Sequence, residues 1–312
     1  RRYQTYVRNY DKKKQIKKVC CGANIDDYYW TEGVLNTAFA NTEDFVHGFM
    51  DYLSLHYYVH PEGWKIKGSA TDFNDAVWYK TLYKALYMDT LVTQHGAIMD
   101  KYDPDKKIGM CVDEWGSWYT CEPGTNPGFL YQQNTLRDAL IAGITLNVFN
   151  KHCDRVKIAA LAQMVNVLQA VILTEGDKMV KTPTYHVMHM YRYHQGASLI
   201  ESAVTGAGET GAGKWTVPKI TESVSKDGEG IITITLNNLS IETAEGMEIK
   251  LADNGYKVIE AKVVTNTDIH AHNTFEAPEQ ITEQEFTGYT EHEDHISVKL
   301  PASSVTVLRV KK

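Results

Sequence analysis

Short apolar stretches alternate with longer amphipathic ones through the first 200 residues, and this alternation constrains the fold more than any other feature. The apolar stretches end at turn-forming or polar residues, which is typical of buried strands. They are residues 16–21, 52–58, 108–112 and 156–163. Helices are expected at residues 72–102, 134–150 and 184–195. Strands that alternate with helices form βαβ units with a parallel sheet, and four such strands are half of a (β/α)₈ barrel.

The pattern changes near residue 200. Gly206 to Gly213 is small and polar, which is typical of a linker or loop. Beyond it, apolar and polar residues alternate with period two in residues 232–237, 247–251, 257–264, 296–300 and 304–310. Short alternating strands joined by Gly, Asn and Asp turns indicate an antiparallel sandwich. We therefore predict an α/β fold plus an all-β fold: a partial barrel over residues 1–198 and a β-sandwich over residues 199–312.

Composition excludes several classes of function. The net charge is -7 and is not gathered in blocks, so we expect neither a nucleic acid nor an anionic membrane as partner. No apolar run approaches the roughly 20 residues that span a membrane. The five cysteines lack CxxC spacing. Because Cys20, Cys21 and Cys111 fall in apolar strand contexts, we expect buried free thiols rather than disulfides.

The first residues do not resemble the beginning of a protein. They contain neither a Met nor a signal peptide, and Tyr3, Tyr6 and Tyr10 stand at helical spacing. Residue 1 is therefore interpreted as the middle of a domain, and the compartment stays open.

Two apparent binding motifs lack the context that they need. Gly206–Gly211 matches the dinucleotide pattern GxGxxG, and Gly208–Lys214 comes within one residue of a phosphate loop. Trp215 stands where the phosphate loop requires Ser or Thr, and Thr216-Val-Pro218 is a poor start for the required helix. The histidines at 186, 189 and 194 have no carboxylate or Cys at zinc spacing. We predict no metal and no organic cofactor.

The stretch Lys107–Tyr119 combines a predicted buried strand with two carboxylates and three aromatic rings. The apolar run Ile108–Val112 leads into Asp113-Glu114 and then into Trp115, Trp118 and Tyr119, with Gly116-Ser117 as an expected break. A carboxylate at the C-terminal end of a parallel barrel strand is where such enzymes carry their chemistry. Aromatic rings beside it suit a sugar, whose C–H faces pack on rings. The alternative is a strand that ends in a solvated acidic turn.

The other predicted strands also end in polar or aromatic side chains. These are Asn24, then His56 with Tyr58, and finally Gln163 with Asn166. Taken singly, each is explained equally well as a satisfied core group or a strand-end cap. In a barrel these ends converge on one face. A glycosidase needs a carboxylate, hydrogen-bond donors and an aromatic wall there; with Glu114 as nucleophile, Tyr58 is placed to hydrogen-bond it.

The motif Asp113-Glu-Trp-Gly-Ser-Trp-Tyr119 resembles the nucleophile motif of the family 51 glycoside hydrolases, the α-L-arabinofuranosidases. Further segments resemble this family in the same order: residues 52–58, 151–159, 161–168, 182–186, 273–278 and 300–308. The resemblance implies a retaining hydrolase built from a (β/α)₈ barrel and a C-terminal β-sandwich. Such an enzyme releases terminal α-L-arabinofuranosyl groups from arabinose-containing oligosaccharides or polysaccharides.

The resemblance also implies roles for single residues. Glu114 is the expected nucleophile, Tyr58 its hydrogen-bond partner, and His56, Trp118 and Gln163 line the sugar pocket together with Asn24. Retention needs a second carboxylate roughly 5–5.5 Å away, which acts as acid and base. In the family this is the Glu of a Gly-Asn-Glu motif.

The sequence contains no Gly-Asn-Glu, and its first strand corresponds to the family's fifth. We therefore expect the C-terminal part of an enzyme, inactive by itself, with the acid/base upstream. Glu175 is the nearest candidate within the chain, although loop Glu residues are mostly solvated.

Two other readings stay open. In the first, the chain is part of a related retaining glycosidase, such as a β-xylosidase or an endoglucanase. In the second, it is a non-catalytic carbohydrate-binding or structural fragment. The expected partner is an arabinose-containing carbohydrate, with a homo-oligomer possible for the full-length protein. The resemblance favours the cytoplasm.

Overall fold

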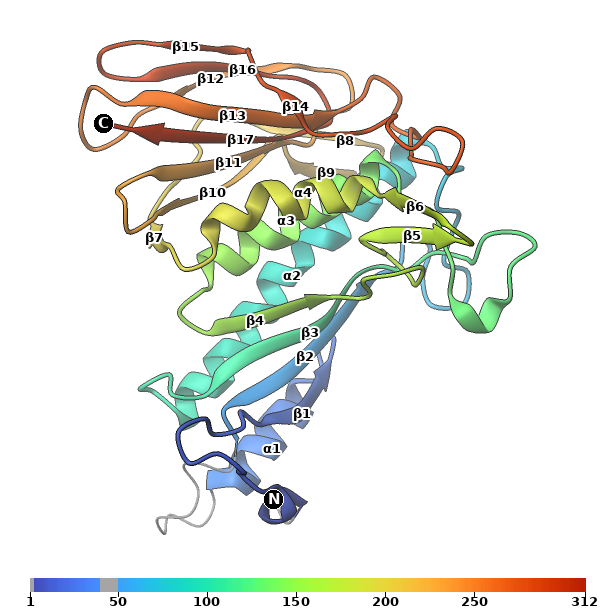
Figure 1. The fold of residues 1–312 in the computed structure, drawn as a ribbon, viewed down its shortest axis with the longest axis vertical. Helices are drawn as coiled ribbons and strands as arrows, with labels where there is room; N and C mark the ends of the chain where they lie inside the picture. Colours follow the sequence, from blue (N-terminus) through green and yellow to red (C-terminus); the bar gives the residue numbers. More distant parts are fainter. Residues whose placement is uncertain (1–2, 40–49) are drawn as a thin grey trace. The chain divides into compact units, whose positions relative to one another are not determined.

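The computed structural model describes residues 3–39 and 50–312, which form two compact units (Figure 1). The first unit lies within Arg1–Tyr58, Met88–Trp115 and His152–Leu161. The second comprises Val59–Tyr87, Gly116–Lys151 and Ala162–Lys312. The predicted division between residues 198 and 199 stays a proposal.

A four-stranded sheet forms the body of the first unit. Its order is β1 (Val19–Asn24), β2 (Tyr52–Val59), β3 (Gly109–Ser117) and β4 (Val156–Leu161). The pairs β1–β2 and β3–β4 are parallel, which confirms parallel pairing at the predicted strands. One detail of the prediction is wrong, because β3 continues through Gly116 and Ser117. Both residues are buried, and the extended chain is carried on by the hydrogen bond from Trp118 N–H to the Val59 carbonyl at 3.0 Å.

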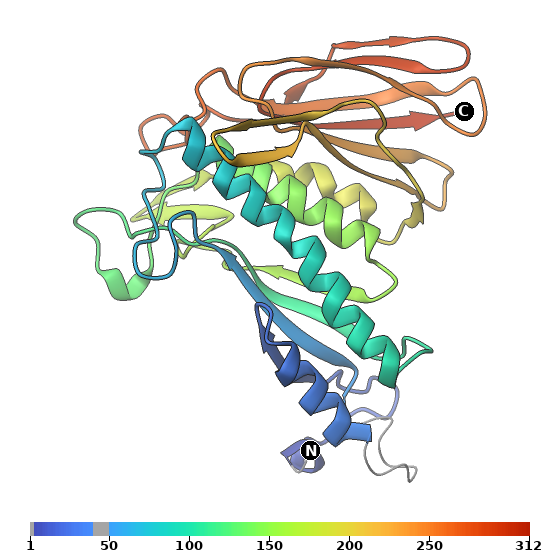
Figure 2. The ribbon, with the colours of Figure 1, turned by 180° about the vertical axis from the view of Figure 1, so that it is seen from behind.

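The helices of the first unit differ from the prediction in two places. Helix α1 (Tyr28–Phe39), which was not predicted, lies beside β1 and buries Thr31, Leu35 and Ala38 at helical spacing (Figure 2). The first residues form only a 3-10 turn, η1 (Tyr3–Tyr6). The predicted helix there is wrong, since the tyrosines that suggested it are exposed and bury no apolar face. Helix α2 (Asp75–Tyr102) was predicted, and its part from Met88 belongs to this unit.

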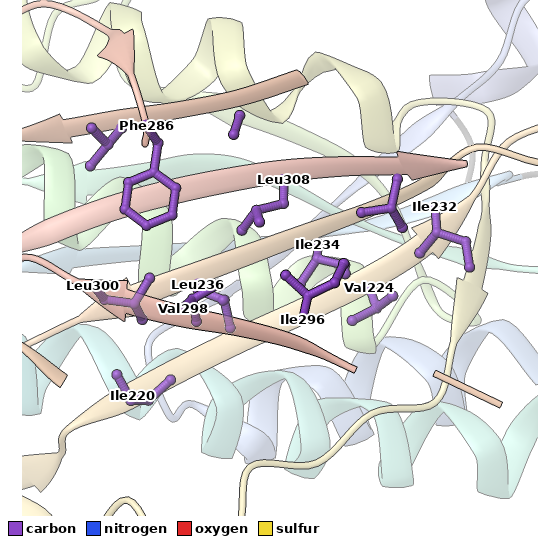
Figure 3. Close-up of a cluster of buried hydrophobic side chains, with 13 residues drawn as sticks. Ile220, Val224, Ile232, Ile234, Leu236, Phe286, Ile296, Val298, Leu300 and Leu308 are labelled. Atoms are coloured by element: carbon purple, nitrogen blue, oxygen red, sulfur yellow. The ribbon is translucent and has the colours of Figure 1, made fainter. Parts of the chain in front are cut away.

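A two-sheet antiparallel sandwich dominates the second unit and confirms the predicted fold of its C-terminal residues. The larger sheet has the order β14 (Gln284–Glu285), β13 (Lys257–Thr265), β17 (Ser304–Lys311), β11 (Ile232–Asn238), β10 (Ile220–Lys226) and β7 (Ser198–Ile200). The smaller sheet has the order β12 (Glu245–Ile249), β16 (Ile296–Leu300) and β15 (Tyr289–Glu291). Side chains from both sheets, among them Ile234, Leu308 and Val298, form the core (Figure 3).

The outer face of the larger sheet is covered by α3 (Leu136–Lys151) and α4 (Pro183–Tyr191), which lie side by side (Figure 1). This interface is polar: Asn147 Oδ1 accepts from Ser223 Oγ and Thr235 Oγ1, both at 2.8 Å. Strand β10 was not predicted because its sequence buries polar residues against these helices. A short turn, η3 (Arg192–His194), replaces the end of the predicted helix.

Two hairpins in the second unit were missed. One joins β5 (Ile172–Glu175) to β6 (Lys178–Lys181), and the other joins β8 (Glu209–Ala212) to β9 (Trp215–Pro218). The predicted linker or loop at 206–213 is therefore wrong for residues 209–212, which form a paired strand. A strand also follows Lys214, where both nucleotide motifs would require a helix.

The five cysteines are free, as predicted. Only Cys111 is buried, whereas Cys20 is half-buried and Cys21 is exposed, so the expected burial is wrong for these two. Within the described ranges, no helix is both long and apolar enough to cross a membrane.

The chain that leaves β3 is held by Asp138 in the first turn of α3. Its Oδ1 accepts from Ser117 Oγ at 2.6 Å and from Tyr119 OH at 2.9 Å. Its Oδ2 accepts from the Thr135 N–H at 2.8 Å, as the N3 side chain does in a capping box, while Thr135 Oγ1 acts as the N-cap and accepts from the Arg137 N–H at 3.2 Å. One buried carboxylate therefore caps the helix and fixes residues 117–119.

Candidate active site

Two adjacent carboxylates, Asp113 and Glu114, stand near the end of β3 in the first unit. Their side chains are 37% and 46% exposed, between the wholly buried Val112 and Trp115. Val112 pairs with Ala159 and Trp115 with Leu161, so β3 carries one residue more than β4 at this point. Such a bulge breaks the alternation of faces along a strand. The bulge explains how the side chains of the adjacent residues Asp113 and Glu114 both reach His56.

The partner of both carboxylates is His56 on β2. Its Nε2 lies 3.2 Å from Asp113 Oδ1, and its Nδ1 lies 3.5 Å from Glu114 Oε2. Ser54, two residues earlier on the same strand, donates its hydroxyl to Asp113 Oδ1 at 2.5 Å. Tyr58, two residues later, donates to Glu114 Oε2 at 2.9 Å. The period of two along β2 thus points three polar side chains at the carboxylate pair.

The tyrosine remains a donor throughout the physiological pH range. Burial raises the pKa of Tyr58 well above its ordinary value, and the hydrogen bond to Glu114 and the negative charges of Glu114 and Asp113 raise it further. Tyr58 therefore orients the Glu114 carboxylate through its hydroxyl, while nearly half of the Glu114 side chain stays exposed.

Asn24 lies next to His56 in the sheet. It ends β1 and pairs in register with His56, and the Ile25 N–H donates to the His56 carbonyl at 2.8 Å. Its side chain is exposed. The structure therefore brings together four of the predicted site residues: Asn24, His56, Tyr58 and Glu114.

Trp118 belongs to an aromatic cluster in the second unit. The Trp64 ring meets it at 72°, with centroids 5.4 Å apart, and the His60 ring lies 5.6 Å away. Lys67 Nζ lies 4.6 Å from the centroid of the Trp64 ring and 5.0 Å from that of Trp118, which are cation–π distances. Trp64 is 64% exposed. Burial lowers the pKa of His60, so its ring is neutral near pH 7.

Sequence reasoning missed Trp64. The available signal was its place in the loop that follows β2, since loops at strand ends carry binding residues. Its contact with Trp118 joins residues 54 positions apart and has no local sequence signature.

Gln163 and Glu175 both line a cavity of about 860 Å³ in the second unit. Gln163 is exposed and anchored through its backbone, which donates to the Val167 carbonyl at 3.1 Å and accepts from the Val171 N–H at 3.3 Å. Asn166, considered with Gln163 at the sequence level, has a structural partner. Its amide bonds Thr174 through three contacts of 2.7–3.1 Å.

Of the three histidines that suggested a metal, two have separate polar partners and the third is buried. His189 Nδ1 lies 2.9 Å from Glu283 Oε2, and His194 Nδ1 lies 2.7 Å from Ser225 Oγ. His186 is buried in α4, where burial lowers its pKa. Among the described residues, no group of three or more His, Cys, Asp or Glu is arranged to hold a metal ion.

Comparison with known proteins gives this geometry its context. The model of the α-L-arabinofuranosidase C-terminal domain matches residues 113–304. An intracellular exo-α-L-arabinofuranosidase of Bacteroides ovatus is 42% identical over 312 residues, which is 100% of this chain and 59% of that protein. The chain belongs to the family 51 α-L-arabinofuranosidases.

Further members of this family agree. The crystal structure of the GH51 arabinofuranosidase from Xanthomonas axonopodis pv. citri superposes with a TM-score of 0.94 at 41% identity, covering 99% of this chain and 61% of that one. An exo-α-(1→6)-L-arabinofuranosidase of Bifidobacterium longum is 26% identical over 95% of this chain and 58% of its own length. The chain thus spans about three fifths of the length of the relatives that it matches.

Proposed function

We propose that this chain carries the nucleophile and part of the sugar pocket of a retaining α-L-arabinofuranosidase. The complete protein releases terminal α-L-arabinofuranosyl groups from oligosaccharides or polysaccharides. The name of the Bacteroides ovatus relative, an exo-α-L-arabinofuranosidase, supports this substrate.

The observation that carries the proposal is the Tyr58–Glu114 contact of 2.9 Å near the end of β3. Glu114 attacks the anomeric carbon, and the C–O bond that forms replaces the bond to the leaving oxygen. Tyr58 orients the attacking carboxylate, and His56 and Asn24 beside it bind sugar hydroxyls. On the second unit, Trp118 and Gln163 are the residues that we propose to bind sugar.

The mechanism needs a second carboxylate that protonates the leaving oxygen and then activates water. We propose that it lies outside these residues, because the sequence contains no Gly-Asn-Glu. Strands β1 to β4 are then the fifth to eighth strands of a (β/α)₈ barrel, which their sequential order and parallel pairs support. Glu175 remains the candidate within the chain. The word intracellular in the relative's name supports a cytoplasmic location.

Azide rescue of Glu114→Ala in the full-length protein tests the nucleophile. Activity on nitrophenyl α-L-arabinofuranoside should fall on the order of 10³-fold or more. Azide should restore turnover and yield arabinofuranosyl azide of inverted anomeric configuration, because it occupies the space of the missing carboxylate. An azide product of retained configuration would identify Glu114→Ala as an acid/base variant instead.

The same assay separates the related glycosidases. Wild-type protein should hydrolyse the nitrophenyl arabinofuranoside far faster than the xyloside. A preference for xyloside would assign the site to a β-xylosidase, and turnover of neither substrate would support a non-catalytic role.

A further inference from the structure

The carboxylate of Asp113 has no part in the proposed mechanism, although it stands next to the nucleophile. Its side chain is 37% exposed, and its Oδ1 has two partners on β2. The Ser54 hydroxyl donates to this oxygen at 2.5 Å, and His56 Nε2 lies 3.2 Å from it. A second carboxylate beside Glu114 brings a like charge close to the group that must act as an anion, which is unfavourable. A role that offsets this repulsion is therefore expected for Asp113.

Other aspartates of the first unit show what a structural carboxylate looks like in this chain. Asp51 accepts from a backbone N–H at 2.9 Å and pairs with Lys17 at 2.9 Å. Asp103 accepts from a backbone N–H at 2.7 Å and pairs with Arg155 at 3.0 Å. Both fix the path of the backbone and compensate a cation. The two partners of Asp113 are instead side chains of β2, and one of them also faces the nucleophile.

The His56 ring lies between the two carboxylates. While Nε2 faces Asp113, Nδ1 lies 3.5 Å from Glu114 Oε2. The orientation of an imidazole is set by the partners of its two nitrogens, so a carboxylate at Nε2 fixes which edge of the ring faces Glu114. Tyr58 donates to the same Glu114 oxygen at 2.9 Å. Rotation of the Glu114 carboxylate would therefore break the contacts with both the ring and the tyrosine.

We propose that Asp113 is a positioning residue for the reaction: it fixes the His56 ring, and through this ring it orients the Glu114 carboxylate. Ser54 holds Asp113 in turn. The proposal rests on the proposed function, because it takes Glu114 as the nucleophile. Asp113 acts without contacting the substrate, so its effect depends on the presence of the His56 ring. Because a misplaced nucleophile reacts more slowly, the contribution of Asp113 falls mainly on kcat.

A double-mutant cycle in the full-length protein tests this dependence. Asp113→Ala should lower kcat/KM for nitrophenyl α-L-arabinofuranoside about 10- to 100-fold, mainly through kcat, because it removes a charged partner of the ring. In a His56→Ala background the same substitution should change kcat/KM by less than about twofold, since the ring through which it acts is gone. Losses that multiply in the double variant, or a loss confined to KM, would overturn the proposal.

Ser54→Ala provides a second cycle that remains available if Asp113→Ala folds poorly, which its melting temperature would show. The substitution leaves Asp113 in place but less firmly held. The value of kcat/KM should therefore fall about threefold in the wild-type background and stay unchanged in the His56→Ala background. Equal losses in the two backgrounds would contradict the proposal.

The pair of Asp89 and His152 supplies a matched control in the same unit. His152 Nε2 lies 2.7 Å from Asp89 Oδ1, and the two side chains are 25% and 59% exposed. The pair thus has the same chemistry outside the site. Asp89→Ala should leave kcat/KM unchanged. A loss equal to that of Asp113→Ala would mean that breaking any aspartate–histidine pair lowers activity, and would overturn the positioning role.

Crystal structures of full-length wild type and Asp113→Ala separate this proposal from the proposed function, because they do not depend on activity. In the variant the His56 ring should turn away from Glu114, and a ring that keeps Nδ1 at Glu114 Oε2 would reject the positioning role. If wild type does not hydrolyse arabinofuranosides, the function is rejected, and a turned ring still assigns the positioning of His56 to Asp113. Hydrolysis with multiplying losses in the cycle would keep the function and reject the positioning role.

Discussion

Two carboxylates in this chain each accept a hydrogen bond from a tyrosine hydroxyl at 2.9 Å, Glu114 from Tyr58 and Asp138 from Tyr119. Each group also contains a serine that donates its hydroxyl to a carboxylate. Ser54 donates to Asp113, the neighbour of Glu114, at 2.5 Å, and Ser117 donates to Asp138 at 2.6 Å. The two groups differ in exposure. The Glu114 side chain is 46% exposed, and Asp138 is 0% exposed.

Because the two carboxylates differ in exposure, similar hydrogen bonds have different effects. Solvent reaches Glu114, which we propose as the nucleophile, so its hydrogen bonds orient a carboxylate that a ligand can contact. Nothing from solvent reaches Asp138, so each donor there satisfies a buried acceptor that would otherwise be costly. Substitutions around Tyr58 and Glu114 should therefore mainly change activity. Substitutions around Tyr119 and Asp138 should mainly change stability.

The carboxylates themselves give the largest contrast. Glu114→Gln should lower kcat on the order of 10³-fold or more, because an amide is a poor nucleophile, and should leave the melting temperature nearly unchanged. Asp138→Asn should destabilise the protein by about 2 kcal/mol, because its amide hydrogens face groups that already donate. Arabinofuranoside hydrolysis and urea unfolding measure the two effects. A large loss of stability in Glu114→Gln would contradict the contrast.

The two tyrosines test the same contrast between activity and stability with a smaller expected effect. Tyr58→Phe should lower kcat/KM about tenfold through the loss of a donor to a charged group, with little change in stability. Tyr119→Phe should lower the free energy of unfolding by about 1–2 kcal/mol and retain most of the activity of each folded molecule. The same two assays apply. If both variants lost stability equally, exposure would not be the deciding variable.

Much of the Glu114 cluster was predictable because it follows from local periodicity. Polar residues two apart on β2 share a face, and an apolar run before Asp113-Glu114 marks a strand end. The bulge that turns both carboxylates toward His56 was not predictable, because it depends on how β3 pairs with β4. The prediction of a break at Gly116 failed for the same reason.

The side-chain contacts of the second unit were predictable only in part. Thr135-x-x-Asp138 before an apolar run is a visible capping-box pattern, but its link to Tyr119 has no local signal. Phe275 reaches the β5–β6 hairpin because Asn273 bonds Lys181, 92 positions away. Strand β10 escaped because its buried side chains are polar. Contacts between distant polar residues carry no period that a sequence could display.

The pH dependence of stability tests the burial of Asp138 directly. Desolvation raises its pKa above the ordinary value of 3.8, so the folded state keeps a proton that the unfolded chain loses as pH rises. The stability from this group is fully present below about pH 4 and declines as pH rises through the folded pKa. Asp138→Asn cannot titrate. The stability difference between wild type and Asp138→Asn should therefore shrink from pH 4 to pH 7 in urea unfolding, and a constant difference would contradict the assignment.

The smallest contrast is between the serines, and it isolates exposure best because both substitutions remove a single hydroxyl. Ser54→Ala leaves Asp113, 37% exposed, with His56 and with access to water, so the loss should stay below about 0.5 kcal/mol. Ser117→Ala takes a donor from Asp138 where water cannot replace it, and should cost about 1–2 kcal/mol. Chemical denaturation of both variants, with Ser198→Ala as an exposed surface control, measures the difference. Equal losses would mean that strand packing around the serines, rather than the exposure of the carboxylate that each one serves, sets the value of these hydrogen bonds.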